Sequence, residues 1–144
     1  MKKIILVFLL FTINNTFCQE KGTTLDTNEE IPVAFIDQIP LFPNCEDIDK
    51  TKQTTCFQKK LDQHVAINFN TPKKLKKGYK ARLIVYFIID QNGNVDEIEV
   101  TGGNSALRKE AVRVFKKLPQ LTPGLQRKKP VRCKFTYPIS IKIT

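Results

Sequence analysis

The chain has 144 residues and a mass of 16.5 kDa, which is the size of one domain. Hydrophobic residues make up 41% and charged residues 26%, a composition typical of a folded chain rather than a disordered one. A single His and no Trp leave few residues for a catalytic triad or a His-rich metal centre. No apolar run reaches the roughly 18 residues that a membrane-spanning helix needs.

Residues 1–18 have the pattern of a secretory signal peptide. Lys2 and Lys3 form a basic start, residues 4–13 form an apolar stretch, and a polar exit follows. We expect cleavage after Cys18, which gives an exported soluble protein. The alternatives are acylation of Cys18, which gives a lipoprotein, and retention of the segment as a short anchor. Phe17 argues against acylation, because a small residue usually precedes an acylated cysteine.

After removal of residues 1–18 the chain has 22 basic and 14 acidic residues, a net charge of +8. Export argues against nucleic acid as the partner of this charge. The charge is typical of a solvated basic surface. The alternative is peripheral contact with an anionic membrane or with acidic protein faces.

Three cysteines remain after the signal peptide, and an oxidising compartment favours a disulfide between two of them. Cys45 and Cys56 flank a short polar stretch, so a bridge between them would connect an irregular segment to the start of a helix. Cys133 lies in a strand pattern, which predicts a buried thiol. A zinc site is the alternative, but its fourth ligand would be His64, which is far from Cys133 in the sequence. We therefore expect no metal.

The first part of the exported chain lacks periodic structure. Residues 19–31 are polar and predict a disordered lead-in, and residues 32–43 contain three prolines, which predicts an extended segment. A helix is expected from a cap at Thr54 or Thr55 to about Asn68. Its apolar stripe has spacing four and consists of Phe57, Leu61, Val65 and Phe69.

The second part predicts a hairpin, a helix and a long strand. Residues 80–90 are apolar on both faces, which predicts a central strand covered on both sides. Asn92-Gly93 indicates a turn, and residues 95–101 return with a bulge at Asp96-Glu97. A second helix is expected after a cap at Asn104 or Ser105, and it ends at Pro119. Residues 131–144 alternate strictly between apolar and polar, as in a strand with one buried face.

This order predicts an α+β fold with a three-stranded antiparallel sheet and two helices on one face. The spatial strand order is 2-1-3, which places the last strand on an edge. Pro138 supports that placement, because proline is confined to edges, strand ends and bulges. A free edge can capture an extended peptide by strand addition. The alternative is that Pro138, Lys134 and Lys142 only protect the edge from aggregation.

Several stretches in order resemble the TonB C-terminal domain family. Residues 38–43 are similar to the Gln-Pro…Tyr-Pro motif that opens the family's domain. Residues 83–95 match its hairpin, and residues 111–124 match its helix with the Pro-Gly exit. Tyr137-Pro138-Ile139 matches the Pro-Ile pair of its last strand. The resemblance covers residues 33–143, so we expect a TonB C-terminal-like domain over residues 32–144.

The resemblance implies a periplasmic binding module rather than an enzyme, without a cofactor. Family members bind the TonB box of outer-membrane receptors by pairing it with the last strand. Carried over to this sequence, the partner-binding residues are Phe135, Thr136, Tyr137, Pro138, Ile139, Ser140, Ile141, Lys142, Gln38, Pro40, Phe42 and Pro43. Because we expect neither a membrane anchor nor a Pro-rich arm, the function predicted is peptide capture near TonB-dependent transport. The alternative is an envelope structural or interaction protein with another partner, or one that forms a homodimer.

Two other sites are disfavoured. Residues 90–97 are acidic enough to suggest a calcium loop, but Val95 and Thr101 stand where an EF-hand needs Gly and Glu. His64 lies beside the apolar stripe of the first helix, which favours a half-buried structural role over that of a catalytic base.

Overall fold

The computed structural model describes residues 29–73 and 75–143. In chain order the elements are β1 (Glu30–Pro32), a 3-10 turn (Val33–Phe35), α1 (Lys50–Asn68), β2 (Lys80–Ile89), β3 (Val95–Gly102), α2 (Ser105–Phe115), β4 (Gly124–Gln126) and β5 (Lys129–Lys142). The predicted signal peptide and most of the predicted lead-in lie outside the described residues. Glu30 and Ile31 lie in β1, so the expectation of disorder is wrong for these two residues.

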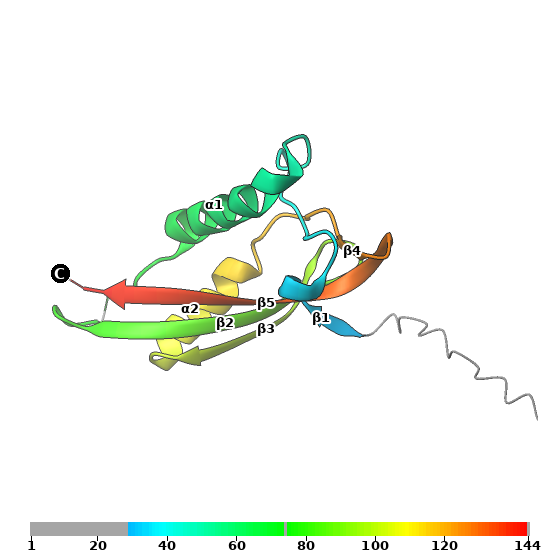
Figure 1. The fold of residues 1–144 in the computed structure, drawn as a ribbon. Coiled ribbons are helices and arrows are strands. Elements are labelled where there is room, and N and C mark those ends of the chain that lie inside the picture. The colour runs from blue at the N-terminus through cyan, green and yellow to red at the C-terminus, as the bar shows by residue number, and fades with distance from the viewer. Residues whose placement is uncertain (1–28, 74, 144) are drawn as a thin grey trace, which may run out of the picture.

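The three long strands lie side by side in the order β3-β2-β5, which confirms the predicted 2-1-3 arrangement (Figure 1). Strand β2 pairs antiparallel with both neighbours. Two short strands were not expected. β1 pairs parallel with Arg132–Lys134 of β5, and β4 pairs antiparallel with Lys129–Val131. The sheet is therefore mixed rather than purely antiparallel, and the first part of β5 is not a free edge.

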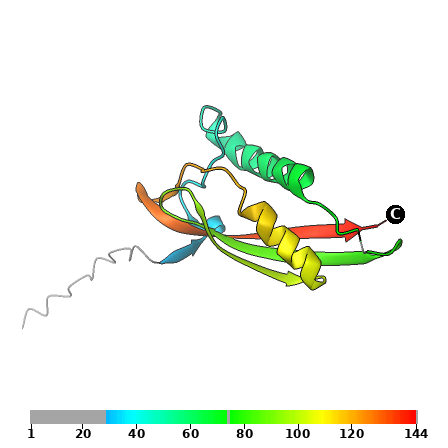
Figure 2. The ribbon, with the colours of Figure 1, turned by 180° about the vertical axis from the view of Figure 1, so that it is seen from behind.

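Both helices cover the same face of the sheet, as predicted (Figures 1 and 2). A row of aromatic rings crosses the core between them, with neighbouring ring centroids 4.9 to 5.7 Å apart. In order of contact the row is Phe42, Phe57, Phe135, Phe87, Phe115 and Tyr137. This row connects both helices to β2 and β5 and makes up much of the core.

Among the described residues, no helix lies over the other face of the sheet (Figures 1 and 2). Ile84 and Tyr86 of β2 point to this face and are half-buried, whereas Ile88 is buried. The expectation that β2 is covered on both sides is therefore wrong for Ile84 and Tyr86. The apolar residues on this side of β2 therefore form a partly exposed surface rather than pack against a second layer.

Helix α1 begins at Lys50, earlier than the predicted cap at Thr54 or Thr55. Residues 50–53 contain no helix breaker, and the Gln53 amide donates to the carbonyls of Glu46 and Ile48 at 3.3 and 3.4 Å. The predicted stripe is confirmed for Phe57, Leu61 and Val65, which are buried, whereas Phe69 lies just after the end of α1 and is half-buried.

The hairpin and the start of the second helix follow the sequence closely, whereas α2 ends at Phe115, before the predicted end at Pro119. The register shifts between Phe87 and Ile89, so Asp96 and Glu97 together oppose Ile88, which is the predicted bulge. In the turn, the Asp90 carboxylate accepts from the backbone N–H groups of Asn92 and Asn94, each at 2.8 Å. Asn104 caps α2, because its side chain accepts from the Leu107 N–H at 2.9 Å.

Candidate functional site

The outer edge of β5 is the first component of the candidate site. On its inner side β5 pairs with β2 from Cys133 to Lys142. The Ile143 N–H donates to the Tyr79 carbonyl at 2.9 Å, so the odd-numbered residues direct their backbone groups toward β2. The even-numbered residues Thr136, Pro138, Ser140 and Lys142 therefore direct theirs away from β2.

Strand β1 covers only the beginning of this edge. Its three residues pair with Arg132, Cys133 and Lys134. Within residues 29–73 and 75–143, no strand pairs with the outer side of β5 from Phe135 to Lys142. Thr136, Ser140 and Lys142 each present an N–H and a C=O there, and Pro138 presents only a C=O. This part of β5 is the open edge that strand addition requires.

A groove runs along the open edge, with the C-terminal half of α1 as its second wall. Its volume is about 380 Å³. The lining residues are Asp62, Val65, Ala66, Phe69, Thr71 and residues 137–142. Apolar side chains from both walls line it together with polar groups such as the Asp62 carboxylate. Such a groove can hold alternate side chains of an extended peptide whose backbone pairs with β5.

The Tyr137 hydroxyl donates to the Asp62 carboxylate at 2.6 Å and so links the two walls. Burial of the phenol, and next the hydrogen bond to Asp62, raise the pKa of Tyr137 above its ordinary value. Tyr137 therefore stays protonated at neutral pH and remains a donor.

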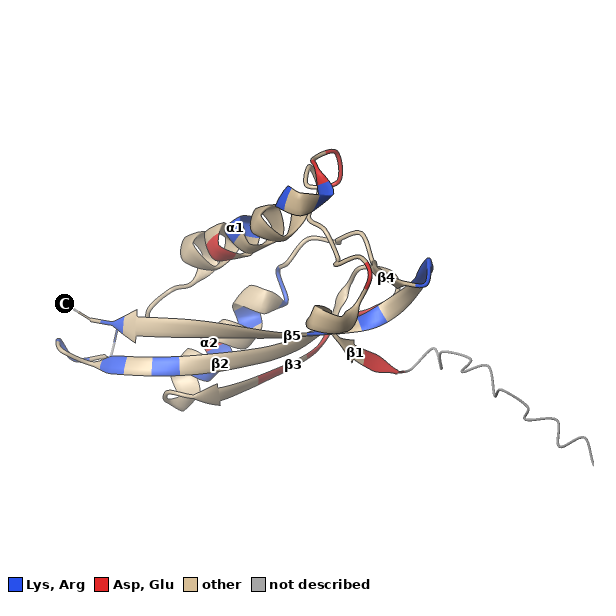
Figure 3. Ribbon diagram, in the orientation of Figure 1, with Lys and Arg blue, Asp and Glu red and all other residues tan. Residues whose placement is uncertain are grey.

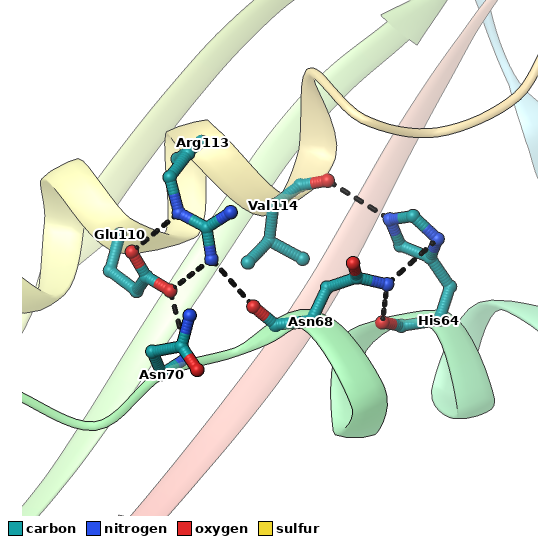
Figure 4. Close-up of polar contacts among 6 residues, drawn as sticks. All are labelled: His64, Asn68, Asn70, Glu110, Arg113 and Val114. Carbon is teal, nitrogen blue, oxygen red and sulfur yellow. Dashed lines mark hydrogen bonds and ion pairs between the residues drawn. The ribbon is translucent and has the colours of Figure 1, made fainter.

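A second polar cluster holds the end of α1 against α2 (Figure 4). The Arg113 guanidinium donates to the Glu110 carboxylate and to the Asn68 carbonyl, the latter at 2.6 Å. Glu110 also accepts from the Asn70 N–H at 2.7 Å. The hydrogen bond from Arg113 lowers the pKa of Glu110, so the carboxylate is charged at neutral pH. This cluster fixes the position of the groove wall that α1 provides.

His64 belongs to the same junction. Its Nε2 lies 3.0 Å from the Val114 carbonyl oxygen, and its Nδ1 lies 3.5 Å from the side-chain nitrogen of Asn68 (Figure 4). His64 is half-buried. Its contacts are those of a residue that joins two helices, in agreement with the predicted structural role.

The predicted site residues fall into two groups that the fold keeps apart. Residues 137–142 border the groove, whereas Phe135 is buried in the core and Thr136 does not line the groove. Gln38 and Leu41 pair with Leu125 and Thr122 beside β4, toward the other end of β5 (Figure 1). Pro40 and Phe42 are buried and only Pro43 is exposed. In this structure, the segment 38–43 anchors the loop before β4 and does not line the groove.

Two components of the site were not identified from the sequence. One is β1, which shortens the open edge. The other is Asp62, which contacts Tyr137 across 75 residues of sequence. The helical spacing could have placed Asp62 next to the apolar stripe, but no local pattern indicates its partner.

The cysteines follow the favoured prediction. Cys45 and Cys56 form a disulfide with their Cα atoms 5.9 Å apart. Cys133 is a free, buried thiol, and burial raises its pKa to about 11. In the described part of the chain, no three His, Cys, Asp or Glu side chains gather as metal ligands.

Comparison with known proteins identifies the domain. The family model described as the Gram-negative bacterial TonB protein C-terminal matches residues 72–143, which is half of the chain. The match includes the hairpin, α2, β4 and β5, whereas α1, the disulfide and residues 38–43 precede it. No curated protein matches the chain. Among the residues described, no helix is both long and apolar enough to cross a membrane. The chain belongs to the TonB C-terminal domain family, and it is a TonB-like envelope protein from a family of non-enzymatic interaction domains associated with TonB-dependent transport.

Proposed function

We propose that this protein captures an extended peptide segment, similar to a TonB box, by adding it as a strand to the outer edge of β5. The observation that carries the proposal is the open edge from Phe135 to Lys142, which has no strand partner among the described residues. The proposed partner is a TonB-dependent receptor of the outer membrane. The proposed location is the periplasm, reached with the signal peptide at residues 1–18.

The geometry of the edge defines the hydrogen bonds that a docked strand would make. It would accept from the N–H groups of Thr136, Ser140 and Lys142 and donate to the carbonyls of the even-numbered residues. Opposite Pro138 it would find an acceptor but no donor. Alternate side chains of the peptide would lie in the groove beside α1, against Val65 and Phe69.

The groove also sets the chemical preference of the peptide. Its walls present Ala66, Phe69 and Ile141, so apolar side chains suit the positions that face α1. The other face of the docked strand would point away from the helices and toward water. A segment with alternating apolar and polar residues is therefore the expected ligand.

A proline at position 140 tests the proposal. Ser140→Pro removes one outward N–H and leaves the inward ladder to β2 in place, because Ser140 does not bond to β2. We expect labelled TonB-box peptides from the host's receptors to bind the wild type saturably and to lose at least tenfold in affinity with Ser140→Pro, since two of three donors then remain and the ring obstructs the edge. Ser140→Ala is the matched control, because it removes the hydroxyl and keeps the N–H.

A second experiment determines the pairing register between the peptide and β5 without changing the protein. Peptides with a single N-methyl group, moved one position at a time, should lose affinity at every second position. Equal loss at all positions, or equal affinity of Ser140→Pro and Ser140→Ala, would contradict strand addition. A different result would be a wild-type protein that binds no peptide but forms a dimer, with the dimer lost in Ser140→Pro. That result would instead assign the edge to a second copy of the chain.

A further inference from the structure

One end of the sheet carries a concentration of positively charged side chains whose charges the peptide proposal does not use. It lies where β2 begins and β5 ends (Figure 3). The cations are Lys73, Lys76 and Lys77 in the loop before β2, Lys80 and Arg82 in β2, and Lys142 in β5. All six are exposed. We call this set the basic end.

Within the basic end, like charges are placed directly opposite each other. Lys80 pairs across the strands with Lys142, and Arg82 lies two residues further along the same face of β2. The Lys80–Lys142 pair is of the non-hydrogen-bonded type, in which the side chains are closest. Like charges in this position destabilise a sheet. The arrangement is therefore unfavourable until an anion lies between the cations.

Other cations on the same face of β5 have their charge matched. Arg132 pairs with Asp96 and Glu97 at 2.7 and 3.1 Å, and Lys134 pairs with Glu30 at 3.2 Å. No ion pair involves the basic end in residues 29–73 and 75–143. The chain thus neutralises its cations at one end of this face and leaves them unmatched at the other.

The surface around these cations suits a flat anionic partner. A shallow hollow of about 460 Å³ is lined by Lys80, Arg82, Ser140 and Lys142 together with Ala81 and Ile141. Next to it on the face without helices lie the half-buried Ile84 and Tyr86. Five of the six cations are Lys, which act as mobile point charges rather than as the rigid forks that recognise one carboxylate. Clustered Lys beside partly exposed apolar and aromatic residues is typical of a surface that binds lipid headgroups.

We propose that the basic end binds phosphate groups of an anionic lipid surface. Lys80, Arg82 and Lys142 would surround a headgroup phosphate, and Lys76 and Lys77 would contact neighbouring headgroups. Ile84 and Tyr86 would lie toward the membrane interface. The interaction uses side chains on the uncovered face of the sheet, whereas the peptide groove lies on the helix side of β5. The two sites adjoin at Ser140, Ile141 and Lys142.

The test compares two variants with the same change in net charge. The test variant carries Lys80→Gln, Arg82→Gln and Lys142→Gln. The control variant carries Lys59→Gln, Lys60→Gln and Lys109→Gln, three exposed cations on the helices. Each protein is mixed with phosphatidylcholine vesicles, with and without phosphatidylglycerol, and the bound fraction is measured by flotation. Any contribution of the apolar residues 4–13 to vesicle binding is the same in both variants.

We expect wild type and control to bind only vesicles with phosphatidylglycerol, and the test variant to bind about a hundredfold more weakly, since each cation near an anionic leaflet contributes roughly a factor of five. The test variant should melt no lower than wild type, because it removes a like-charge pair. Displacement by inorganic phosphate at constant ionic strength would show that a single phosphate occupies the hollow. Lack of such displacement would show that an array of headgroups is the ligand.

Equal weakening of both variants would overturn the proposal, because net charge alone would then explain binding. Full binding by the test variant would overturn it as well. Binding of wild type to polyglutamate but not to vesicles would assign the basic end to an acidic protein instead of a membrane.

Discussion

The hydroxyl of Tyr137 on β5 donates a hydrogen bond of 2.6 Å to the carboxylate of Asp62 on α1. The Tyr137 ring also contacts Phe115 of α2, with the centroids 5.7 Å apart. One side chain of the edge strand is thus fixed by both helices. These contacts fix the position of Tyr137 relative to α1, and therefore the separation between the two walls of the groove.

Tyr137→Phe should destabilise the domain by about 1 kcal/mol at neutral pH, the usual net contribution of a hydrogen bond to a charged or polar partner. The raised pKa of Tyr137 adds a pH dependence. Because the folded state favours the protonated phenol, this contribution is complete below the ordinary phenol range near pH 10 and is lost as the pH rises above it. The difference between wild type and Tyr137→Phe in urea denaturation should therefore shrink in alkali.

Asp62→Asn provides the comparison for this prediction, since it keeps an acceptor oxygen and removes the charge. It should destabilise less than Tyr137→Phe. An unchanged difference between wild type and Tyr137→Phe from neutral to strongly alkaline pH would show that Tyr137 is not shielded as described.

Reduction of the Cys45–Cys56 disulfide should lower the free energy of unfolding by about 2–3 kcal/mol, the chain-entropy estimate for so short a loop. The bridge joins the segment before α1 to the second turn of the helix, and its two cysteines are separated by 11 positions in the sequence. Thermal melts with and without dithiothreitol measure the effect. In a Cys45→Ala, Cys56→Ala variant the reductant should have no effect.

Gly93→Ala should destabilise the hairpin more than Gly78→Ala does. Both glycines have positive φ, +82° and +83° respectively, so alanine costs similar backbone strain at each position. A Cβ at Gly93 would lie 1.7 Å from the Leu121 carbonyl oxygen, whereas a Cβ at Gly78 meets nothing within 4 Å. We expect about 1 kcal/mol for Gly78→Ala and at least twice that for Gly93→Ala. Equal melting temperatures would show that the loop at Leu121 does not lie on the hairpin turn.

Glu110→Gln should weaken the junction between the helices by about 1 kcal/mol at neutral pH. The lowered pKa of Glu110 means that its contribution is present above the ordinary carboxyl range and is lost as the pH falls through and below that range. Wild type and Glu110→Gln should therefore converge in acid. Glu99→Gln, at an exposed position on β3, should match wild type at both pH values.

Cys133 should react slowly with a disulfide reagent such as Ellman's reagent in the native protein. Its thiol is buried, and burial raises its pKa to about 11, so little thiolate is present at neutral pH. Addition of denaturant should release one rapidly reacting thiol per chain. A fast native reaction would place Cys133 at the surface, contrary to the structure.

Elements with a pattern of their own could be predicted from the sequence. The alternation of residues 131–144 indicated the buried side of β5, and the broken alternation at Asp96-Glu97 indicated a bulge. Asn104 was one of two predicted caps and is the one used. These features depend on residues close together in the chain, so local chemistry decides them.

The short strands could not be predicted in the same way. β1 and β4 have three residues each, too few for any periodicity. Each exists because a partner strand lies beside it. The start of α1 was also misplaced, because Thr54 and Thr55 are good caps but residues 50–53 already suit a helix.

The same distinction applies to the candidate site. Pro138 and the alternation of β5 predicted an edge and the face that its side chains share. The length of that edge depends on β1, and the second wall of the groove depends on where α1 packs. Both follow from tertiary contacts, such as Tyr137 with Asp62, between residues far apart in sequence.

Strand β1 occupies the outer side of β5 as far as Lys134 and runs parallel to it. A strand added from Phe135 onward would meet the end of β1, so β1 would limit how far such a strand could extend along β5. About eight residues of a bound segment, opposite Phe135 to Lys142, could pair with β5 before the segment would have to bend away or displace β1. A longer ligand would gain no further pairing with β5. The length of a ligand, and not only its composition, would therefore affect how tightly it binds.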